Sequence, residues 1–192
     1  MKSTARAALA ILGLAALVFA SPAAAQGRDM GAYVGVAIGQ ATQDGQCDNV
    51  APPVTCDDKD SAWKIFGGYQ FNRNLAVELG YSNFGEATAR SGAGFVTDEA
   101  SAFEMTGVLM LPLADRFSIY GKLGFYRGEL ERTSNLATPT GTNSSTGLTF
   151  GGGVRFDVTN AIGVRLEYQI YPDLGDLPDV KVMSVGVLFK FQ

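Results

Sequence analysis

The sequence predicts an all-β fold, an eight-stranded antiparallel transmembrane up-and-down β-barrel, and three observations carry this prediction. The chain begins with an export signal. Eight later segments alternate apolar and polar side chains with a period of two residues, which is typical of strands with one dry and one wet face. The connections between these segments alternate between short and long, as they do in bacterial outer-membrane barrels.

The first 25 residues have the features of a cleaved signal peptide. Lys2 and Arg6 supply a positive start, an apolar run follows, and Ala23-Ala24-Ala25 fits the small-residue cleavage rule. The alternative is a membrane helix, but the apolar run is too short for one. We therefore expect residues 1–25 to be a signal peptide and residues 26–192 to form a single barrel domain.

The exported part of the chain is moderately acidic. The full chain has a formal net charge of −4 at pH 7, and the leader holds two basic and no acidic residues, so the exported part is more acidic still. This charge argues against a nucleic-acid partner, which requires a basic patch. The exported part has no apolar run of membrane-helix length, so in a membrane it must cross with strands.

The first three predicted strands occupy residues 32–40, 63–71 and 75–81, and a tight turn at Asn72-Arg73 joins the last two. Strands of about ten residues cross a bilayer at a tilt of roughly 45°. The side chains predicted to face lipid are Val34, Val36, Ile38, Trp63, Ile65, Tyr69, Phe71, Leu75, Val77, Leu79 and Tyr81. The opposite face carries Gly35, Ala37, Gly39, Lys64, Phe66, Gln70, Ala76 and Glu78.

The next three predicted strands occupy residues 100–111, 117–127 and 146–158. Their outward side chains are Phe103, Met105, Leu109, Leu111, Phe117, Ile119, Leu123, Phe125, Leu148, Phe150, Val154 and Phe156. Their inward side chains are Glu104, Thr106, Val108, Tyr120, Lys122, Tyr126, Thr149 and Arg155.

The last two predicted strands occupy residues 162–170 and 182–191. Their outward side chains are Ile162, Val164, Leu166, Tyr168, Ile170, Met183, Val185, Val187, Phe189 and Phe191. Their inward side chains are Arg165, Glu167, Gln169, Ser184, Gly186 and Lys190. A single barrel strand gives only a weak signal, so the prediction depends on eight of them in succession.

Connection lengths give independent support for a membrane barrel. The three short connections are residues 72–73, 112–116 and 157–161. The four long connections are residues 41–60, 85–99, 128–145 and 171–181. Strict alternation places all turns at one end of the barrel and all loops at the other. In bacterial outer-membrane barrels the turns are periplasmic and the loops are extracellular.

The polar face of the predicted strands collects eight charged side chains, and this face is assigned to the interior. A soluble eight-stranded barrel has an apolar interior instead. Turning this chain inside out for water would expose roughly thirty large apolar side chains, far more than a soluble surface tolerates. The predicted lumen charge network is Lys64, Glu78, Glu104, Lys122, Arg155, Arg165, Glu167 and Lys190.

Two interpretations of this network stay open. It could form a selectivity or gating lumen, or it could be a satisfied network that fills a narrow barrel, because eight strands leave room only for side chains. Aromatic residues near the strand ends suit interfacial girdles, although strand propensity alone also explains them. These aromatics are Tyr33, Trp63, Tyr69, Phe71, Tyr81, Phe117, Phe189 and Phe191.

The sequence resembles the small OmpA-type family of eight-stranded outer-membrane barrels. The residues that carry the resemblance span nearly all of the exported chain and fall on the predicted strands. They are the stretches 66–72 (FGGYQFN), 78–81 (ELGY), 119–124 (IYGKLG), 152–154 (GGV), 165–169 (RLEYQ) and 184–191 (SVGVLFKF). Such barrels host structural, adhesive, enzymatic and transport roles, so the resemblance is specific for fold rather than for function.

The resemblance implies a polar, charged lumen without a continuous wide pore. Glu78 and Arg165 match family positions whose side chains form an interior ion pair that blocks the lumen. The companion acidic and basic positions hold Arg155 and Val108 here, so a gated channel does not carry over from the family. The best-known members follow the barrel with a periplasmic peptidoglycan-binding domain, and residues 26–192 match the barrel part.

Cys47 and Cys56 lie in a polar stretch of an exported chain, which predicts a disulfide that closes this loop. The two cysteines without a histidine make an incomplete set for a metal site. Two groups of acidic loop residues could bind Ca²⁺ or Mg²⁺ that bridges lipopolysaccharide phosphates, although solubility explains them equally well. They are Asp44, Asp48, Asp57, Asp58 and Asp60, and Asp173, Asp176 and Asp179.

The chain contains no histidine, and no nucleophile–base arrangement stands out, so we expect neither an enzyme nor a cofactor or metal site. The favoured function is a structural and surface-interaction barrel of the bacterial outer membrane. The alternatives are a small channel or conduit for apolar molecules and, third, a barrel enzyme. The expected partners are outer-membrane lipid and lipopolysaccharide, the barrel-assembly machinery and an extracellular loop ligand, with the barrel a monomer.

Overall fold

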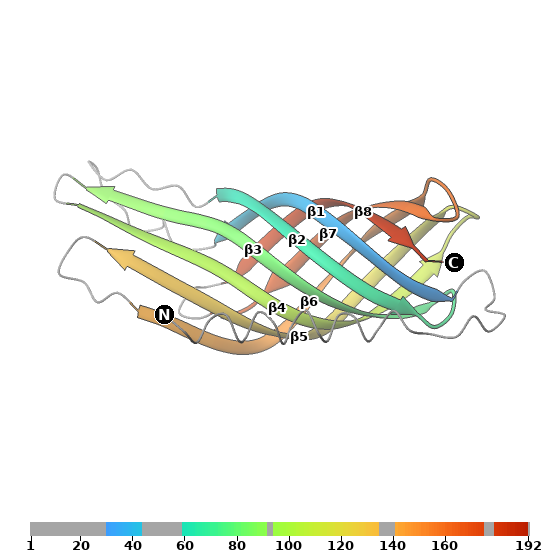
Figure 1. Ribbon diagram of the computed structural model, residues 1–192, viewed down its shortest axis with the longest axis horizontal. Coiled ribbons are helices and arrows are strands. Elements are labelled where there is room, and N and C mark those ends of the chain that lie inside the picture. The colour runs from blue at the N-terminus through green and yellow to red at the C-terminus, as the bar shows by residue number, and fades with distance from the viewer. Residues whose placement is uncertain (1–29, 44–58, 92–93, 135–140, 175–178, 192) are drawn as a thin grey trace.

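A computed structural model describes residues 30–43, 59–91, 94–134, 141–174 and 179–191. They form a closed barrel in which each strand pairs antiparallel with the next and the last pairs with the first (Figure 1). The strands are β1 (Gly31–Gln43), β2 (Lys59–Gln70), β3 (Leu75–Ser91), β4 (Gly94–Pro112), β5 (Phe117–Ser134), β6 (Gly141–Asp157), β7 (Ile162–Tyr171) and β8 (Val180–Lys190). The predicted eight-stranded barrel is confirmed.

Closure of the barrel depends on the pairing of β1 with β8, which runs from Tyr33 opposite Lys190 to Gln43 opposite Val180. Antiparallel closure removes the open sheet edges that a membrane would not tolerate. Within the described residues, no helix has the length and apolar character needed to cross a membrane.

The β2–β3 turn is longer than predicted, because β2 ends at Gln70 and β3 begins at Leu75. The Asn72 side chain explains the difference. Its Oδ1 accepts hydrogen bonds from the backbone N–H groups of Asn74, at 2.8 Å, and Leu75, at 2.9 Å. Asn side chains commonly cap turns in this way, and here the cap extends the turn to four residues.

Apolar and polar side chains separate onto the two faces of the barrel wall. The apolar side chains of the alternating strands are exposed on the outside, where lipid surrounds an outer-membrane barrel. One aromatic contradicts the girdle prediction: Tyr33 is only 4% exposed and lies inside, where its ring contacts Phe66 edge-on at 6.5 Å. Successive side chains of a strand point to opposite faces, and Tyr33 lies on the inward face of β1 together with Ala37.

Two of the predicted long loops are largely strand. The segments predicted as loops at 85–99 and 128–145 instead extend β3 to Ser91, β4 from Gly94, β5 to Ser134 and β6 from Gly141. Backbone pairing continues to Ser91 opposite Gly94 and to Arg132 opposite Gly141. Apart from a few apolar residues such as Leu130, these segments are mostly polar or small, so they lack the apolar alternation by which sequence reveals a strand.

Four strands therefore project beyond the others at the loop end of the barrel. In Figure 1 the ends of β3, β4, β5 and β6 reach furthest to the left. The pairing of β2 with β3 ends at Trp63 opposite Asn83, and the pairing of β6 with β7 begins at Phe150 opposite Ile170. Beyond these points the four strands form a sheet of their own, which we call the projecting sheet.

The interior holds two apolar clusters, one toward each end of the barrel. The cluster toward the loop end contains Ala41, Ala62, Phe84, Ala100, Ala102, Tyr126, Leu130, Tyr171, Leu174 and Val180. The cluster toward the turn end contains Tyr33, Ala37, Phe66, Ala76, Val108, Met110, Tyr120 and Leu188. Charged side chains occupy the space between the two clusters.

Candidate functional site

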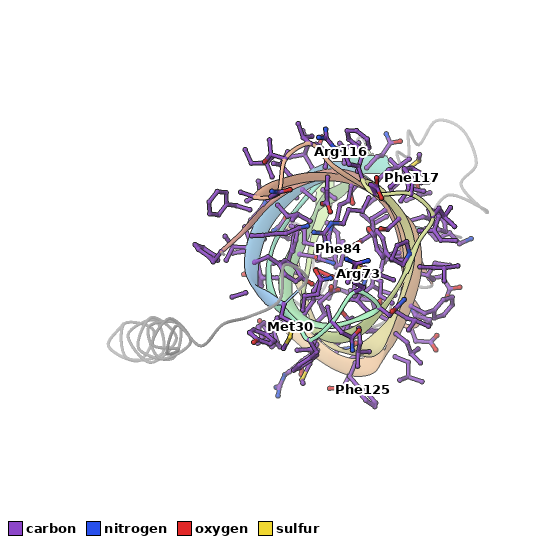
Figure 2. The ribbon with its side chains drawn as sticks, turned by 90° about the vertical axis from the view of Figure 1, so that its right-hand side faces the viewer. Met30, Arg73, Phe84, Arg116, Phe117 and Phe125 are labelled. Atoms are coloured by element: carbon purple, nitrogen blue, oxygen red, sulfur yellow. The ribbon has the colours of Figure 1, made fainter. Side chains whose placement is uncertain are left out.

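Side chains fill the ring of strands in the view along the barrel (Figure 2), where Phe84 lies inside the ring and Phe125 outside it. Six of the charged residues predicted for the lumen come together midway along the barrel, and we call them the central network. They are Lys64, Glu78, Glu104, Lys122, Arg165 and Glu167, and all six are buried.

Lys64 on β2 lies at the loop-end side of the central network. Its Nζ donates to Glu104 Oε1 at 2.5 Å and to Gln169 Oε1 at 2.8 Å, and it lies 3.3 Å from Glu167 Oε1. Three acceptors from two strands, β4 and β7, thus surround one ammonium group, which satisfies the three donors that such a group carries.

Lys122 on β5 is surrounded by carboxylates. Its Nζ lies 3.4 Å from Glu167 Oε2 and 3.6 Å from both Glu78 Oε1 and Glu104 Oε1. These separations are those of ion pairs, and three anions around one cation keep a charged lysine tolerable at this depth.

Arg165 on β7 completes the central network. Its Nη1 donates to Glu78 Oε2 at 2.8 Å and to Glu78 Oε1 at 3.2 Å, and its Nη2 lies 3.3 Å from Glu167 Oε2. The Phe66 ring stacks on the guanidinium, with the Arg165 central carbon 3.5 Å from the ring centroid. A guanidinium tolerates this stacking better than an ammonium group, because it is planar and weakly hydrated.

Neutral side chains that the sequence prediction did not include complete the hydrogen bonding of the carboxylates. Tyr120 donates to Glu167 Oε2 at 2.9 Å, and Tyr171 donates to Glu104 Oε2 at 2.5 Å. Gln169 Nε2 also donates to Glu104 Oε2, at 2.9 Å. Tyr120 and Gln169 lie on the inward face that alternation predicts, so their position on this face could have identified them as partners of the carboxylates. Tyr171 lies one residue beyond the predicted end of its strand.

Glycines on the neighbouring strands make room for the charged side chains. The pairs are Glu78 opposite Gly68, Glu104 opposite Gly80, Lys122 opposite Gly151, Glu167 opposite Gly153 and Arg165 opposite Gly186. A Cβ on Gly80 would already lie 3.1 Å from Lys64 Cε and 3.2 Å from Glu104. Inward glycines therefore set the space in which the central network packs.

The central network is electrically balanced, with three cations and three carboxylates. Burial of such groups is not itself a source of stability, because desolvation offsets the Coulomb attraction. Removal of one member is costly, however, because it leaves an opposite charge buried without a partner. The network is thus a set of mutually dependent side chains that fixes how the interior packs.

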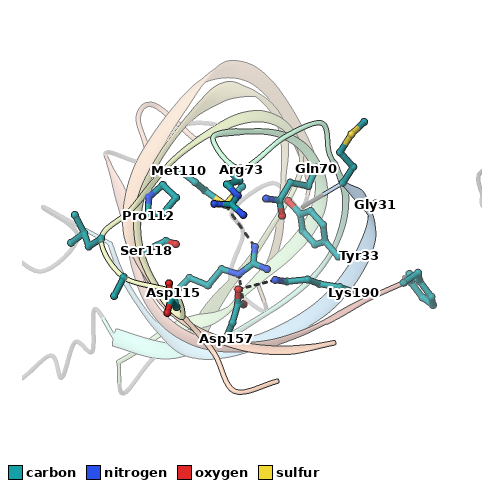
Figure 3. A pocket seen from close by; sticks show the side chains of 15 residues that line it. Gly31, Tyr33, Gln70, Arg73, Met110, Pro112, Asp115, Ser118, Asp157 and Lys190 are labelled. Carbon is teal, nitrogen blue, oxygen red and sulfur yellow. Dashed lines mark hydrogen bonds and ion pairs between the residues drawn. The ribbon is translucent and has the colours of Figure 1, made fainter. Parts of the chain in front are cut away.

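Arg155 and Lys190 lie apart from the central network, at the turn end of the barrel. Arg155 Nε donates to Asp157 Oδ1 at 2.9 Å, and Lys190 Nζ donates to Asp157 Oδ2 at 2.8 Å. Figure 3 shows Asp157 and Lys190 among the side chains that line a pocket there. Asp157 lies where the predicted strand 146–158 overlaps the predicted connection 157–161, and it was not among the predicted network residues. Its position next to Phe156 at the end of the strand was the available signal.

The structure clarifies the two positions at which the chain departs from the OmpA-type pattern. Glu78 and Arg165 form an ion pair, as the resemblance implies. At the companion positions Val108 packs in the turn-end apolar cluster, and Arg155 pairs with Asp157. The lumen carboxylates are instead shared with Lys64 and Lys122, which come from β2 and β5.

The space left beside the central network is small. Two cavities of about 10 Å³ each flank it, one beside Lys64 and Ser82 and the other beside Glu78 and Arg155. A cavity needs roughly 10–15 Å³ to hold one water molecule.

The loop end of the lumen is covered by Leu174, which is 0% exposed. Leu174 follows Asp173, whose φ of 51° lies in the left-handed region.

Several predicted residues lie outside the described part of the chain. Cys47 and Cys56 are among them, so the disulfide stays a prediction, as do the signal peptide and the acidic group at residues 44–58. Of the acidic loop residues, Asp60, Asp173 and Asp179 are described. Within the described ranges, no three His, Cys, Asp or Glu side chains are grouped so that they could hold a metal ion.

Comparisons with known proteins agree with this architecture. A family model described as the OmpA-like transmembrane domain matches residues 28–192. Outer membrane protein A of Escherichia fergusonii is 32% identical over 204 residues, a match that covers 100% of this chain and 56% of that protein. The chain thus spans about half the length of such relatives.

Solved outer-membrane barrels share the fold. OprG of Pseudomonas aeruginosa superposes with a TM-score of 0.58 at 13% identity, covering 86% of this chain and 98% of that one. Ail of Yersinia pestis superposes with a TM-score of 0.55 at 18% identity, covering 84% of this chain and 100% of the other. These likenesses concern the fold alone.

Proposed function

Because this chain belongs to the OmpA-like transmembrane domain family and is a β-barrel of the bacterial outer membrane, we propose that it is a closed structural barrel that presents its extracellular segments to partners. The observation that carries this proposal is the filled interior. The central network and the two apolar clusters occupy the lumen except for the pocket at its turn end, and the cavities beside the network have room for about one water molecule each.

The filled interior argues against the alternative of a standing channel or conduit. An ion that crosses the barrel must pass both the loop-end cluster, where Phe84 and Leu174 are fully buried, and the central network, where Lys64 and Lys122 bridge carboxylates from several strands. Opening that path requires the separation of buried ion pairs, which is costly in a low-dielectric interior. The lumen charges accordingly serve to fill and fix the barrel.

The projecting sheet supports the surface-interaction part of the proposal. Its outward side chains at the base are polar and exposed, among them Arg127, Glu129, Ser144 and Thr146. It has two edges, along β3 beyond Asn83 and along β6 before Phe150. With turns on the periplasmic side, as in bacterial barrels generally, this sheet stands outside the cell.

The charge of the extracellular segments restricts the class of ligand. Ail of Yersinia pestis was crystallised with the heparin analogue sucrose octasulfate, a polyanion. In this chain, acidic residues outnumber basic ones in the four connections at the loop end. We therefore propose a partner that is neutral or cationic, or one that reaches the loops through divalent cations.

The outward side chains of the barrel suit a lipid environment. Exposed apolar residues such as Ile38, Leu109 and Leu123 contact lipid in the outer membrane. We infer that the barrel is a monomer inserted by the barrel-assembly machinery, that residues 1–25 are removed on export and that the protein is not an enzyme. The absence of histidine from the sequence supports the last point.

Planar-bilayer recording tests the closed-barrel part of the proposal. The purified protein is expected to give no stable current, and Glu78→Ala or Arg165→Ala is expected to leave the current near zero while the barrel still folds. A steady single-channel current from the wild type would contradict the proposal.

Whole-cell binding tests the surface-interaction part of the proposal. Deletion of residues 87–98, which shortens the projecting sheet, should abolish partner binding without loss of the protein from the outer membrane.

A further inference from the structure

The turn end of the barrel contains a pocket that the closed-barrel proposal does not use. It has a volume of about 330 Å³, large enough for a small organic ligand, and we call it the vestibule. Its walls come from the strand ends and from the turns after β2 and β4 (Figure 3). With the turns on the periplasmic side, the vestibule opens toward the periplasm.

The vestibule is cationic in a chain that is acidic overall. Three basic side chains line it, Arg73, Arg155 and Lys190, against two carboxylates, Asp115 and Asp157. Asp157 is already shared between two of the cations, because one of its oxygens accepts from Arg155 and the other from Lys190. One positive charge therefore remains in excess at the closed end of the vestibule.

Arg155 supplies the second observation. Its side chain is 5% exposed, yet its Nη2 has no hydrogen-bond partner among the described residues. Its Nη1 meets Met110 Sδ at 3.7 Å, and a thioether is a weak acceptor. A buried guanidinium normally uses its N–H groups on strong acceptors, because each buried donor left without a partner is costly.

We propose that the vestibule binds a small oxyanion, a carboxylate or a phosphate, which Arg155 and Lys190 hold at its closed end. Both cations converge on Asp157, so an oxyanion there gains a charge-assisted hydrogen bond from the partly exposed Lys190 and the attraction of the Arg155 guanidinium, and it offsets the excess positive charge. Tyr33, Met110 and Leu113 also line the vestibule and suit a short organic stem on the anion. This site goes beyond the proposed function and does not depend on it.

Titration of the full-length protein in lipid nanodiscs tests the site. The probes are N-acetyl-alanine, which carries a peptide-like carboxylate, and inorganic phosphate, with N-acetyl-alaninamide as the neutral control. Binding is followed by calorimetry and by the ¹⁵N signals of the arginine side chains. We expect saturable binding of at least one anion, a shift of the Arg155 Nε signal and no binding of the amide.

Variants assign the binding to the vestibule. Arg155→Met and Lys190→Gln should each weaken binding about tenfold or more, the effect of losing one cation beside the bound anion. Arg116→Gln is the matched control, because Arg116 is a cation at the same end of the barrel that does not line the vestibule. Lys190 is partly exposed, so Lys190→Gln decides the outcome if Arg155→Met does not fold.

The probes also identify the source of the anion. Preference for N-acetyl-alanine indicates a peptide carboxylate, preference for phosphate indicates a phosphate group, and equal binding supports the shared oxyanion chemistry. The proposal is overturned if neither anion binds, if the neutral amide binds as well as N-acetyl-alanine, or if Lys190→Gln binds as tightly as the wild type.

Discussion

Arg165 Nη1 donates to both carboxylate oxygens of Glu78, at 2.8 and 3.2 Å, across the interior of the barrel. The two residues lie on β7 and β3, which are four strands apart in a closed ring of eight. The ion pair thus joins opposite walls that share no backbone hydrogen bonds. Each residue also contacts a second partner, Lys122 for Glu78 and Glu167 for Arg165.

Glu78→Ala should lower the free energy of unfolding by about 3–5 kcal/mol, because it leaves Arg165 buried without its main partner. The measurement is equilibrium unfolding by urea in lipid vesicles, followed by Trp63 fluorescence. The double variant Glu78→Leu, Arg165→Met should recover most of the loss, since an apolar pair of similar volume avoids the uncompensated charge. A double variant as unstable as Glu78→Ala would contradict this account.

Tyr171→Phe should cost about 1.5–3 kcal/mol of stability, because its hydroxyl donates to the Glu104 carboxylate in a buried setting. Tyr168→Phe is the matched control: Tyr168 lies three residues earlier on β7 and is 46% exposed on the lipid face. The same unfolding assay applies to both variants. Equal losses for the two tyrosines would show that the hydrogen bond to Glu104 contributes nothing.

Gly153→Ala should prevent folding or cost more than the roughly 1–3 kcal/mol that overpacking usually costs. A Cβ there would lie 2.0 Å from the backbone oxygen of Leu166 and 2.9 Å from Tyr120 Oη, so the added atom meets backbone that cannot move aside. At Gly107 the nearest atom would lie 3.8 Å away, so Gly107→Ala should fold normally. Heat-modifiable gel mobility distinguishes folded from unfolded barrels; normal folding of Gly153→Ala would refute the packing argument.

Leu174→Ala should lower stability by about 2–5 kcal/mol, because Leu174 is 0% exposed in the loop-end cluster. Leu113→Ala should change it little, since Leu113 is 57% exposed in the β4–β5 turn. Thermal unfolding of the two variants under identical conditions gives the comparison. If Leu174→Ala matched Leu113→Ala, the connection after β7 would not be part of the core.

Period-two alternation predicts which side chains enter the lumen, because one face of each strand meets lipid and the other does not. It correctly places Lys64 and Glu167 inside. It does not predict that Lys64 pairs with Glu104, since that contact depends on barrel radius and strand stagger rather than on neighbouring sequence. Asp157 was missed because a carboxylate next to a turn looks like an ordinary turn residue.

The lengths of the projecting strands are a second property that period-two alternation does not predict. The projecting parts of β3 to β6 are mostly polar or small on both faces, so no regular apolar period marks these strands. What remains is backbone pairing between neighbours, such as Ser91 opposite Gly94, and sequence composition does not record it. Polar, glycine-containing segments therefore looked like loops.

The ion pairs of the central network join different hairpins, and this limits how the barrel can assemble. Lys64 and Glu78 sit on one hairpin, Glu104 and Lys122 on the next, and the strongest contacts run between hairpins rather than within them. A lone hairpin that entered lipid would carry its charges without these partners, at a cost of several kcal/mol. Neutralisation is completed only when β2, β3, β4, β5 and β7 have come together around the lumen, so an open intermediate that lacks any of these strands carries unpaired charges.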